Sequence, residues 1–186
     1  PFPVQEAEID FIITSVNEEQ KSALVLVAAV QKKHIAERLS LFSQAGHDPS
    51  LISVDMFALF GLFREIPSYQ SASGAVGIID LGMHSTSLIA VLNQEIRVVR
   101  TLAYGLATAV KDAGASADLK PQQVMDHLLR FGVQQGEADQ NKQIIQNSLT
   151  AYFKKLHFAL SSTFNKLQID QAETLFLCGV GADIKD

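Results

Sequence analysis

Tryptophan is absent from this chain of 186 residues, and cysteine occurs once, as Cys178. A single cysteine excludes an internal disulfide bond and fits a reducing compartment. Long apolar runs are also missing, because the longest one, residues 23–30, is far shorter than the roughly 20 residues that cross a bilayer. Glu6, Glu8 and Asp10 interrupt the N-terminal stretch, so no signal peptide is expected there.

Positive charge is in deficit. The chain has 15 Lys and Arg against 20 Asp and Glu, a net charge of −5, so nucleic acid is not an expected partner. The basic residues are scattered along the sequence, and no cluster of them suggests an anionic membrane surface. Hydrophobic residues make up 47% and charged residues 19%, which is typical of a globular protein of one or two domains.

The first third of the chain predicts a strand, a turn, a strand and a helix. Apolar residues alternate over 7–16, residues 23–30 are a fully apolar run, and 32–45 has helical spacing before Gly46 as a C-cap. A short strand is expected over 51–54, followed by a helix for which Asp55 is the N-cap. The polar and small residues 68–74 predict a linker or domain boundary.

The remainder predicts an antiparallel meander followed by helices. Strands are expected over 75–81, 87–93 and 95–102, and Gly105 then precedes a helix over 106–113. Pro121 begins a further helix, since proline is favoured at the first helical position. A long amphipathic helix and a closing strand over 173–178 complete the chain, which is therefore α/β.

One short segment carries the candidate chemistry. Asp80, Gly82, Ser85 and Thr86 form a strand-end turn in which clustered backbone amides can bind an anion. The two hydroxyls add donors to a phosphate, and Asp80 can hold a hydrated Mg²⁺ through oxygen. The simpler interpretation is that the Asp–Gly pair makes the turn and the hydroxyls satisfy local backbone groups.

The D-x-G-x-x-x-T pattern of this turn, its meander and the final Gly179-Val180-Gly181 resemble the second half of the actin, sugar-kinase and heat-shock chaperone superfamily. Within it the chain resembles the PilM family of type IV pilus proteins, which have a "PF" opening, a V-L-V-A-A strand and an A-G-x-x-P segment. These are found here in Pro1-Phe2-Pro3, residues 25–29 and residues 45–49. The resemblance extends through nearly the whole chain.

The resemblance implies an actin-like (ribonuclease H-like) lobe with a meander sheet and helices, plus a small FtsA-like inserted α/β subdomain. The inserted subdomain would be residues 1–48, residues 49–73 would return to the first lobe and form a linker, and residues 74–186 would be the second lobe. A helical insertion is expected at about 111–170. The chain starts without Met and stops just after a glycine turn, so we expect a segment incomplete at both ends.

The same resemblance implies a cytoplasmic scaffold for pilus assembly, peripheral at the inner membrane and without a segment that inserts into it. Its partner would be the cytoplasmic tail of a PilN-like membrane protein, docked in a groove bordered by residues 1–30 and the helix from Lys32. Other inner-membrane components of a pilus or secretion machine would be further partners.

ATP and Mg are the cofactors implied, with Gly179 and Gly181 on the adenosine side. Met125 and Leu128 stand where the family has an acidic residue and a lysine for the ribose. We therefore expect at most a weak ATPase, and no residue is predicted to be catalytic. The alternatives are the GspL-like cytoplasmic domain of a type II secretion system with a degenerate nucleotide site, and an ATP-dependent kinase or ATPase of the same superfamily.

Overall fold

A computed structural model describes residues 3–132 and 140–184. The Pro1-Phe2 opening, residues 133–139 within the predicted helical insertion and residues 185–186 lie outside this range. The chain divides into two compact units, Pro1–Ile66 and Pro67–Asp186. The division lies next to the linker predicted at 68–74. The finer boundaries at 48 and 73 stay predictions.

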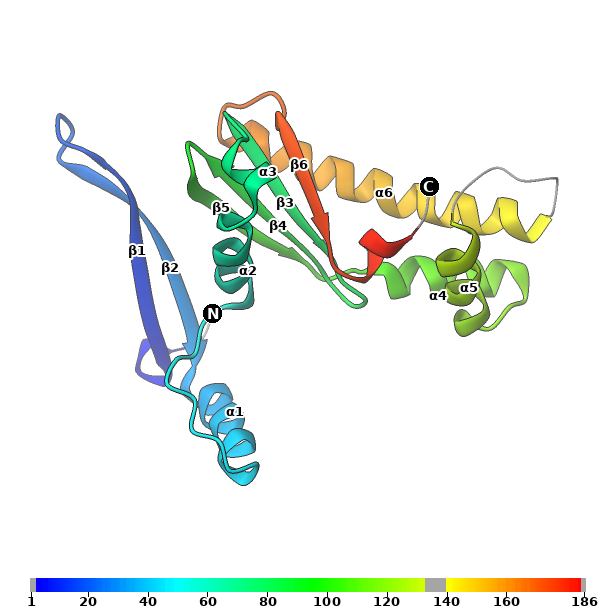
Figure 1. Cartoon of the computed structure of the whole chain (residues 1–186), viewed down its shortest axis with the longest axis horizontal. Coiled ribbons are helices and arrows are strands. Elements are labelled where there is room, and N and C mark those ends of the chain that lie inside the picture. The colour runs from blue at the N-terminus through cyan, green and yellow to red at the C-terminus, as the bar shows by residue number, and fades with distance from the viewer. Residues whose placement is uncertain (1–2, 133–139, 185–186) are drawn as a thin grey trace. The chain divides into compact units, whose positions relative to one another are not determined.

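The first unit is built on a two-stranded antiparallel ribbon (Figure 1). After a 3-10 turn at Val4–Glu6, strand β1, Ala7–Asn17, pairs with β2, Ser22–Gln31. The register places Phe11 opposite Val27, and it shifts at Thr14 between Ile13 and Ser15. Thr14 is buried there, and its hydroxyl donates to the carbonyl of Leu24 at 3.3 Å.

The two faces of this ribbon differ. Residues directly opposite one another in an antiparallel pair share a face. One face, which we call the outer ribbon face, is entirely apolar and exposed: Ile9, Phe11, Ile13, Val25, Val27 and Ala29. The other face mixes charged and apolar residues, with Glu8, Asp10 and Ile12 on β1 and Leu26, Ala28 and Val30 on β2.

Two helices complete the first unit. Helix α1, Lys32–Gln44, follows β2 directly, and its C-cap is Ala45, one residue before the predicted Gly46. Gly46 comes next with a φ of +78°, the left-handed conformation that commonly follows a helix C-terminus. Helix α2, Asp55–Arg64, begins one residue earlier than predicted, because Val54 is the N-cap and Asp55 is the first helical residue. The Asp55 carboxylate accepts the N–H of Met56 at 2.8 Å.

The strand predicted over 51–54 is wrong. These residues connect α1 to α2 without strand structure, and within the described part of the first unit only β1 and β2 form a ladder. A strand is defined by hydrogen bonds to a neighbour, and the apolar residues Leu51 and Ile52 have none in this unit. Both side chains are exposed.

The second unit contains a four-stranded sheet in the order β5-β4-β3-β6 (Figure 1). Strands β3, Ala75–Leu81, β4, Thr86–Leu92, and β5, Glu95–Leu102, form the predicted meander. Asn93 and Gln94 join the last two with φ of 53° and 66°, the left-handed pair that a tight hairpin turn needs. Strand β6, Thr174–Cys178, pairs in parallel with β3.

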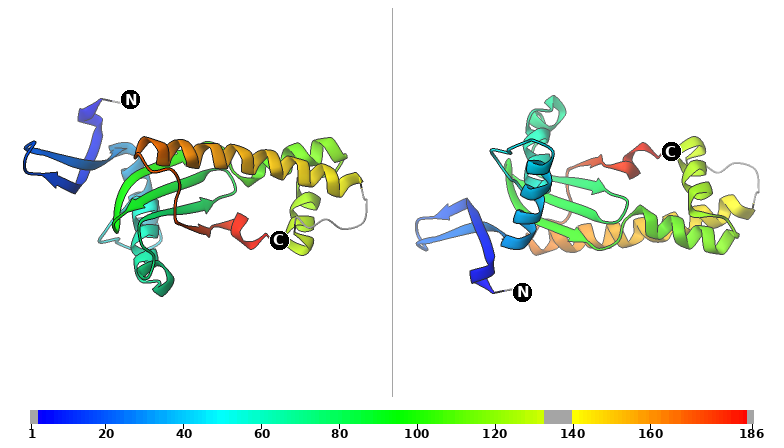
Figure 2. Two further views of the ribbon diagram at one scale, coloured as in Figure 1. Left: turned by 90° about the horizontal axis from the view of Figure 1, so that it is seen from above. Right: turned by 90° about the horizontal axis from the view of Figure 1, so that it is seen from below.

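Helices cover the sheet of this unit. The short α3, Pro67–Gln70, places Tyr69 against Phe176 of β6, with ring centroids 5.9 Å apart. On the opposite face lies α6, Gln140–Lys166 (Figure 2). Helices α4, Leu106–Ala117, and α5, Pro121–Phe131, lie past the ends of the strands, beside the first half of α6. Their shared core includes Leu88, Leu106, Leu128, Leu149 and Leu156. Nearly all of the buried apolar side chains of the described residues belong to this unit, so most of the hydrophobic stabilisation arises here.

Candidate functional site

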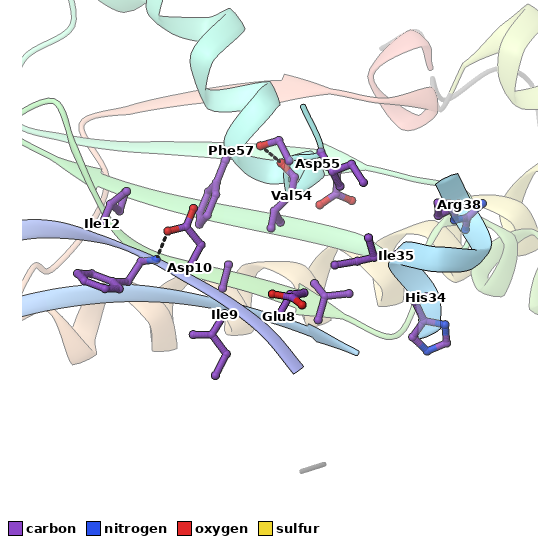
Figure 3. A pocket seen from close by; sticks show the side chains of 15 residues that line it. Glu8, Ile9, Asp10, Ile12, His34, Ile35, Arg38, Val54, Asp55 and Phe57 are labelled. Carbon is purple, nitrogen blue, oxygen red and sulfur yellow. Dashed lines mark hydrogen bonds between the residues drawn. The ribbon is translucent and has the colours of Figure 1, made fainter. Parts of the chain in front are cut away.

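The first unit carries an apolar groove of about 560 Å³. The ribbon contributes residues 8–12 of β1 with Ala28 and Val30 of β2. One side of α1 and the segment that leads into α2, residues 52–55 and Phe57, complete the lining. Figure 3 shows side chains from these elements directed into a common space, among them Asp10, Ile35 and Phe57. The volume is in the range of small-ligand or peptide sites.

One side of the groove is the free edge of β1. The N–H of Phe11 donates to Oδ1 of Asp10 at 2.8 Å, a bond drawn in Figure 3, so it points away from β2. Backbone groups of an antiparallel strand alternate between its two edges, which puts the amides of Ile9 and Ile13 on the same free edge. This edge can therefore pair with an added strand.

The polar groups of the groove carry both signs of charge. Glu8, Asp10 and Asp55 contribute carboxylates, while Arg38 and His34 from α1 contribute a guanidinium and an imidazole. The Glu8 carboxylate lies 3.8 Å from the amine of Lys32, and both side chains are more than half exposed. Exposed pairs of this kind contribute little to stability, so Glu8 and Lys32 can separate to contact a ligand.

A second candidate site lies in the second unit, where β3 and β6 end side by side. Asp80 pairs with Cys178 across the parallel ladder, and Gly179 follows immediately. A Cβ on Gly179 would collide with the Asp80 carboxylate, and the φ of +81° there also favours glycine. The fold thus brings Asp80 and the Gly179–Gly181 turn together, as the predicted nucleotide site requires.

The turn after Asp80 packs tightly on the start of α4. Gly82 and Met83 accept backbone N–H groups from Leu106 and Ala107 at 3.0 and 2.8 Å. Gly82 does not have a positive φ, so its backbone conformation does not require glycine. It is glycine for a steric reason, since a Cβ would lie 2.6 Å from the carbonyl oxygen of Ser85.

Thr86 lies in a different environment from the rest of the turn. It is fully buried, and its hydroxyl lies 2.7 Å from the phenol oxygen of Tyr152 on α6. Ser85, by contrast, is exposed. Of the two hydroxyls predicted to contact phosphate, Ser85 is the accessible one, and Thr86 joins the turn to the helical layer.

Burial shapes the acid–base chemistry beneath the turn. Desolvation raises the pKa of Tyr152 above its ordinary value of 10, Asp80 and Tyr104 raise it further, and the hydrogen bond to Thr86 opposes the shift. Burial, with a smaller contribution from Asp80, also raises the pKa of the Cys178 thiol. That thiol donates to the carbonyl of Ile79 at 3.5 Å. Both groups are therefore protonated near neutral pH.

Met125 and Leu128, which stand where the family has its ribose-binding pair, belong to the core of the second unit. Leu128 is fully buried and Met125 is 8% exposed, and both pack between α4, α5 and α6. Neither side chain can hydrogen-bond a sugar. The described residues include no group of three or more His, Cys, Asp or Glu arranged to hold a metal ion. Across residues 3–132 and 140–184, no helix has the length and apolar character of a membrane span.

Comparison with known proteins places these features in context. The family model described as "Type IV pilus assembly protein PilM" matches residues 1–186. A chain of the solved PilM–PilN type IV pilus biogenesis complex is similar in structure, with a TM-score of 0.72 and 23% identity, over 98% of this chain and 52% of that one. The chain thus spans about half the length of that relative. No match was found among curated proteins.

A second solved structure, MreB5 of Spiroplasma citri bound to ADP, matches with a TM-score of 0.49 and 11% identity, over 97% of this chain and 78% of that one. The closer likeness to the pilus complex establishes the fold. The predicted α/β class and actin-like architecture are therefore confirmed.

Proposed function

Since this chain belongs to the PilM family of type IV pilus assembly proteins, we propose that it serves as a scaffold that docks the cytoplasmic tail of a PilN-like membrane protein. The groove of the first unit would hold that tail. The protein would act on the cytoplasmic side of the inner membrane, held there through its partner. The related complex contains PilN, as its name states.

The observation that carries this proposal is the combination of a free strand edge with an apolar groove. An extended peptide that binds beside β1 would pair with the outward amides of Ile9 and Phe11, while its alternate side chains would enter the space near Ile12, Ile35 and Phe57. Backbone pairing supplies affinity in this binding mode and the side-chain pockets supply specificity. The Asp10 carboxylate would release the Phe11 amide to the peptide.

Two neighbouring isoleucines of β1 allow a matched test. Ile12 lines the groove and is 49% exposed, whereas Ile13 lies on the outer ribbon face and is 58% exposed. A synthetic peptide with the tail sequence of the partner would be titrated by fluorescence anisotropy. We expect Ile12→Glu to weaken binding at least tenfold, because it replaces about 1.5 kcal/mol of apolar contact with a charge.

The Ile13→Glu variant is the control. It places the same charge on the same strand but on the opposite face, and it should leave the dissociation constant within about twofold of the parent. Equal loss in both variants would point to general damage to the ribbon. Unchanged binding in Ile12→Glu would contradict docking in this groove.

A second function rests on the contact between Asp80 and Gly179. We propose that Mg·ATP binds at this end of β3 and β6, with the 82–85 turn on the phosphates, Asp80 on a hydrated Mg²⁺ and Gly179 and Gly181 on the adenosine side. The buried Met125 and Leu128 offer the ribose no hydrogen bond, so affinity would be low and hydrolysis weak at most. ATP would here stabilise a conformation rather than drive chemistry.

Calorimetric titration of Mg·ATP into the protein tests this second function. Asp80→Ala should abolish the binding heat, while Asp112→Ala, which removes an exposed carboxylate from α4, should leave it unchanged. Circular dichroism of both variants would establish that they are folded. Absence of heat in the folded parent protein would leave peptide docking as the sole function proposed.

A further inference from the structure

Helix α6 has an unusual charge for this chain. Between Gln140 and Lys166 it contains Lys142, Lys154, Lys155 and Lys166 and no aspartate or glutamate. The chain as a whole has a net charge of −5. A helix of uniform positive charge within an acidic protein forms a local site for an anionic partner.

The exposed side of α6 also carries large aromatic groups. Phe158 is 76% exposed and Phe153 is 37% exposed, whereas Tyr152, Leu156 and Ala159 are buried against the rest of the second unit. Lys154 and Phe158 are four residues apart and so lie on one line along the helix. Lys155 and Lys166 both lie on one side of this line, and the distance along the helix from Lys154 to Lys166 is about 18 Å. In Figure 2 the helix runs along one side of its unit.

Strand β5 and the residues that follow it add a cationic and an aromatic group next to this helix. A hollow of about 450 Å³ is lined by Arg100 and Tyr104 together with Lys154, Lys155 and Phe158. The Arg100 guanidinium donates to the carbonyl of Ala159 at 3.4 Å, which holds it beside the helix. Phe158 separates this hollow from a second one, whose rim includes Lys166. None of the described residues that line either hollow is acidic.

We propose that this surface, named here the α6 ridge and made of Arg100, Lys154, Lys155, Phe158 and Lys166, adsorbs to anionic phospholipid. Lysine and arginine beside an anionic bilayer gain electrostatic energy, and an aromatic side chain enters the boundary between headgroups and acyl chains. Phe158 stands out from the protein surface between cations, as such contact requires. The proposed binding is peripheral, at the level of the headgroups.

An acidic protein segment would use the same charges but would leave Phe158 without a function, because that ring projects outward from the ridge. Nucleic acid is disfavoured by the net charge of −5 of the whole chain. The groove and the ridge belong to different units, so adsorption through the ridge does not require a peptide docked in the groove. The scattered basic residues of the sequence are brought together here by the fold, which places Arg100 of β5 next to α6.

Co-sedimentation of the full chain with lipid vesicles tests the proposal. One set of vesicles contains phosphatidylglycerol and phosphatidylcholine in equal parts, and the other contains phosphatidylcholine alone. We expect binding to the first set only, weakened by added salt. Lys154→Gln with Lys155→Gln should reduce the partition coefficient about 30-fold, at roughly fivefold per lysine. Phe158→Ala should reduce it about tenfold.

The matched control is Lys111→Gln with Lys120→Gln, which removes the same charge from exposed positions of the same unit but not from the ridge. This variant should bind like the parent. Equal loss in the two double variants, or equal binding to neutral vesicles, would overturn the proposal. Binding of a poly-glutamate peptide with the same dependence on Lys154 and Lys155, without binding to vesicles, would assign the ridge to an acidic protein instead.

Discussion

The hydrogen bond between Thr86 and Tyr152 gives a quantitative prediction about the second unit. The two oxygens are 2.7 Å apart, Thr86 has no exposed surface and Tyr152 has 4%. Either Thr86→Val or Tyr152→Phe leaves the other hydroxyl buried without this partner. An unsatisfied buried hydroxyl costs about 1–3 kcal/mol, so each single substitution should lower the free energy of unfolding by about 2 kcal/mol.

The double variant should be less damaged than the two single variants suggest. With both hydroxyls removed, the pocket holds two apolar groups of nearly the original shape, and the loss should be about 1–2 kcal/mol. The sum of the single effects, about 4 kcal/mol, would then exceed the double effect by at least about 2 kcal/mol. That difference measures the interaction between the two side chains.

Urea unfolding followed by tyrosine fluorescence is suited to this cycle. The chain has no tryptophan, and its three tyrosines, Tyr69, Tyr104 and Tyr152, all lie in the second unit. The signal therefore reports that unit alone, and two tyrosines remain in Tyr152→Phe. If the double variant loses the sum of the single effects within about 0.5 kcal/mol, the two hydroxyls are not coupled and the reasoning is refuted.

Two further predictions concern the same unit. Leu128→Ala should lower the free energy of unfolding of this unit by about 3 kcal/mol, because Leu128 is fully buried. The neighbouring Leu129 is 40% exposed, so Leu129→Ala should cost less than about 1 kcal/mol. Equal losses of the two variants in urea unfolding would contradict the packing described. Stability should also fall as pH rises above about 10, because the raised pKa of Tyr152 keeps it protonated in the folded state while the unfolded state already ionises. Tyr152→Phe should make this fall less steep, which urea titrations at several alkaline pH values would measure.

The regular elements could be predicted from the sequence because their signals are local. The apolar run at 23–30, the meander after residue 75 and Pro121 at a helix start are all confirmed, with boundaries within a few residues. The PilM resemblance is confirmed as well. The prediction of a strand over 51–54 was wrong, because an extended apolar segment becomes a strand only beside another strand. The sequence does not show whether such a neighbour is present.

The environment of the candidate sites could not be predicted in the same way. Thr86 and Tyr152 are 66 positions apart in the chain, and no local pattern links a turn hydroxyl to a phenol on a distant helix. The α6 ridge likewise depends on Arg100, which adjacent strands and helices bring to Lys154. The hydrogen bond from the Phe11 N–H to the Asp10 carboxylate shows which edge of β1 is free, and the sequence does not predict this bond. Long-range packing determines all three.

The outer ribbon face has a consequence for how the chain behaves at high concentration. Ile9, Phe11 and Ile13 are about half exposed, and among the described residues β1 and β2 pair only with each other, so each strand has an outer edge to which another strand can add. Copies can therefore add edge to edge and stack these apolar faces, as in cross-β assembly. Any partner or further domain that covers the ribbon would also protect the protein from aggregation, so solubility itself becomes a readout of whether that surface is occupied.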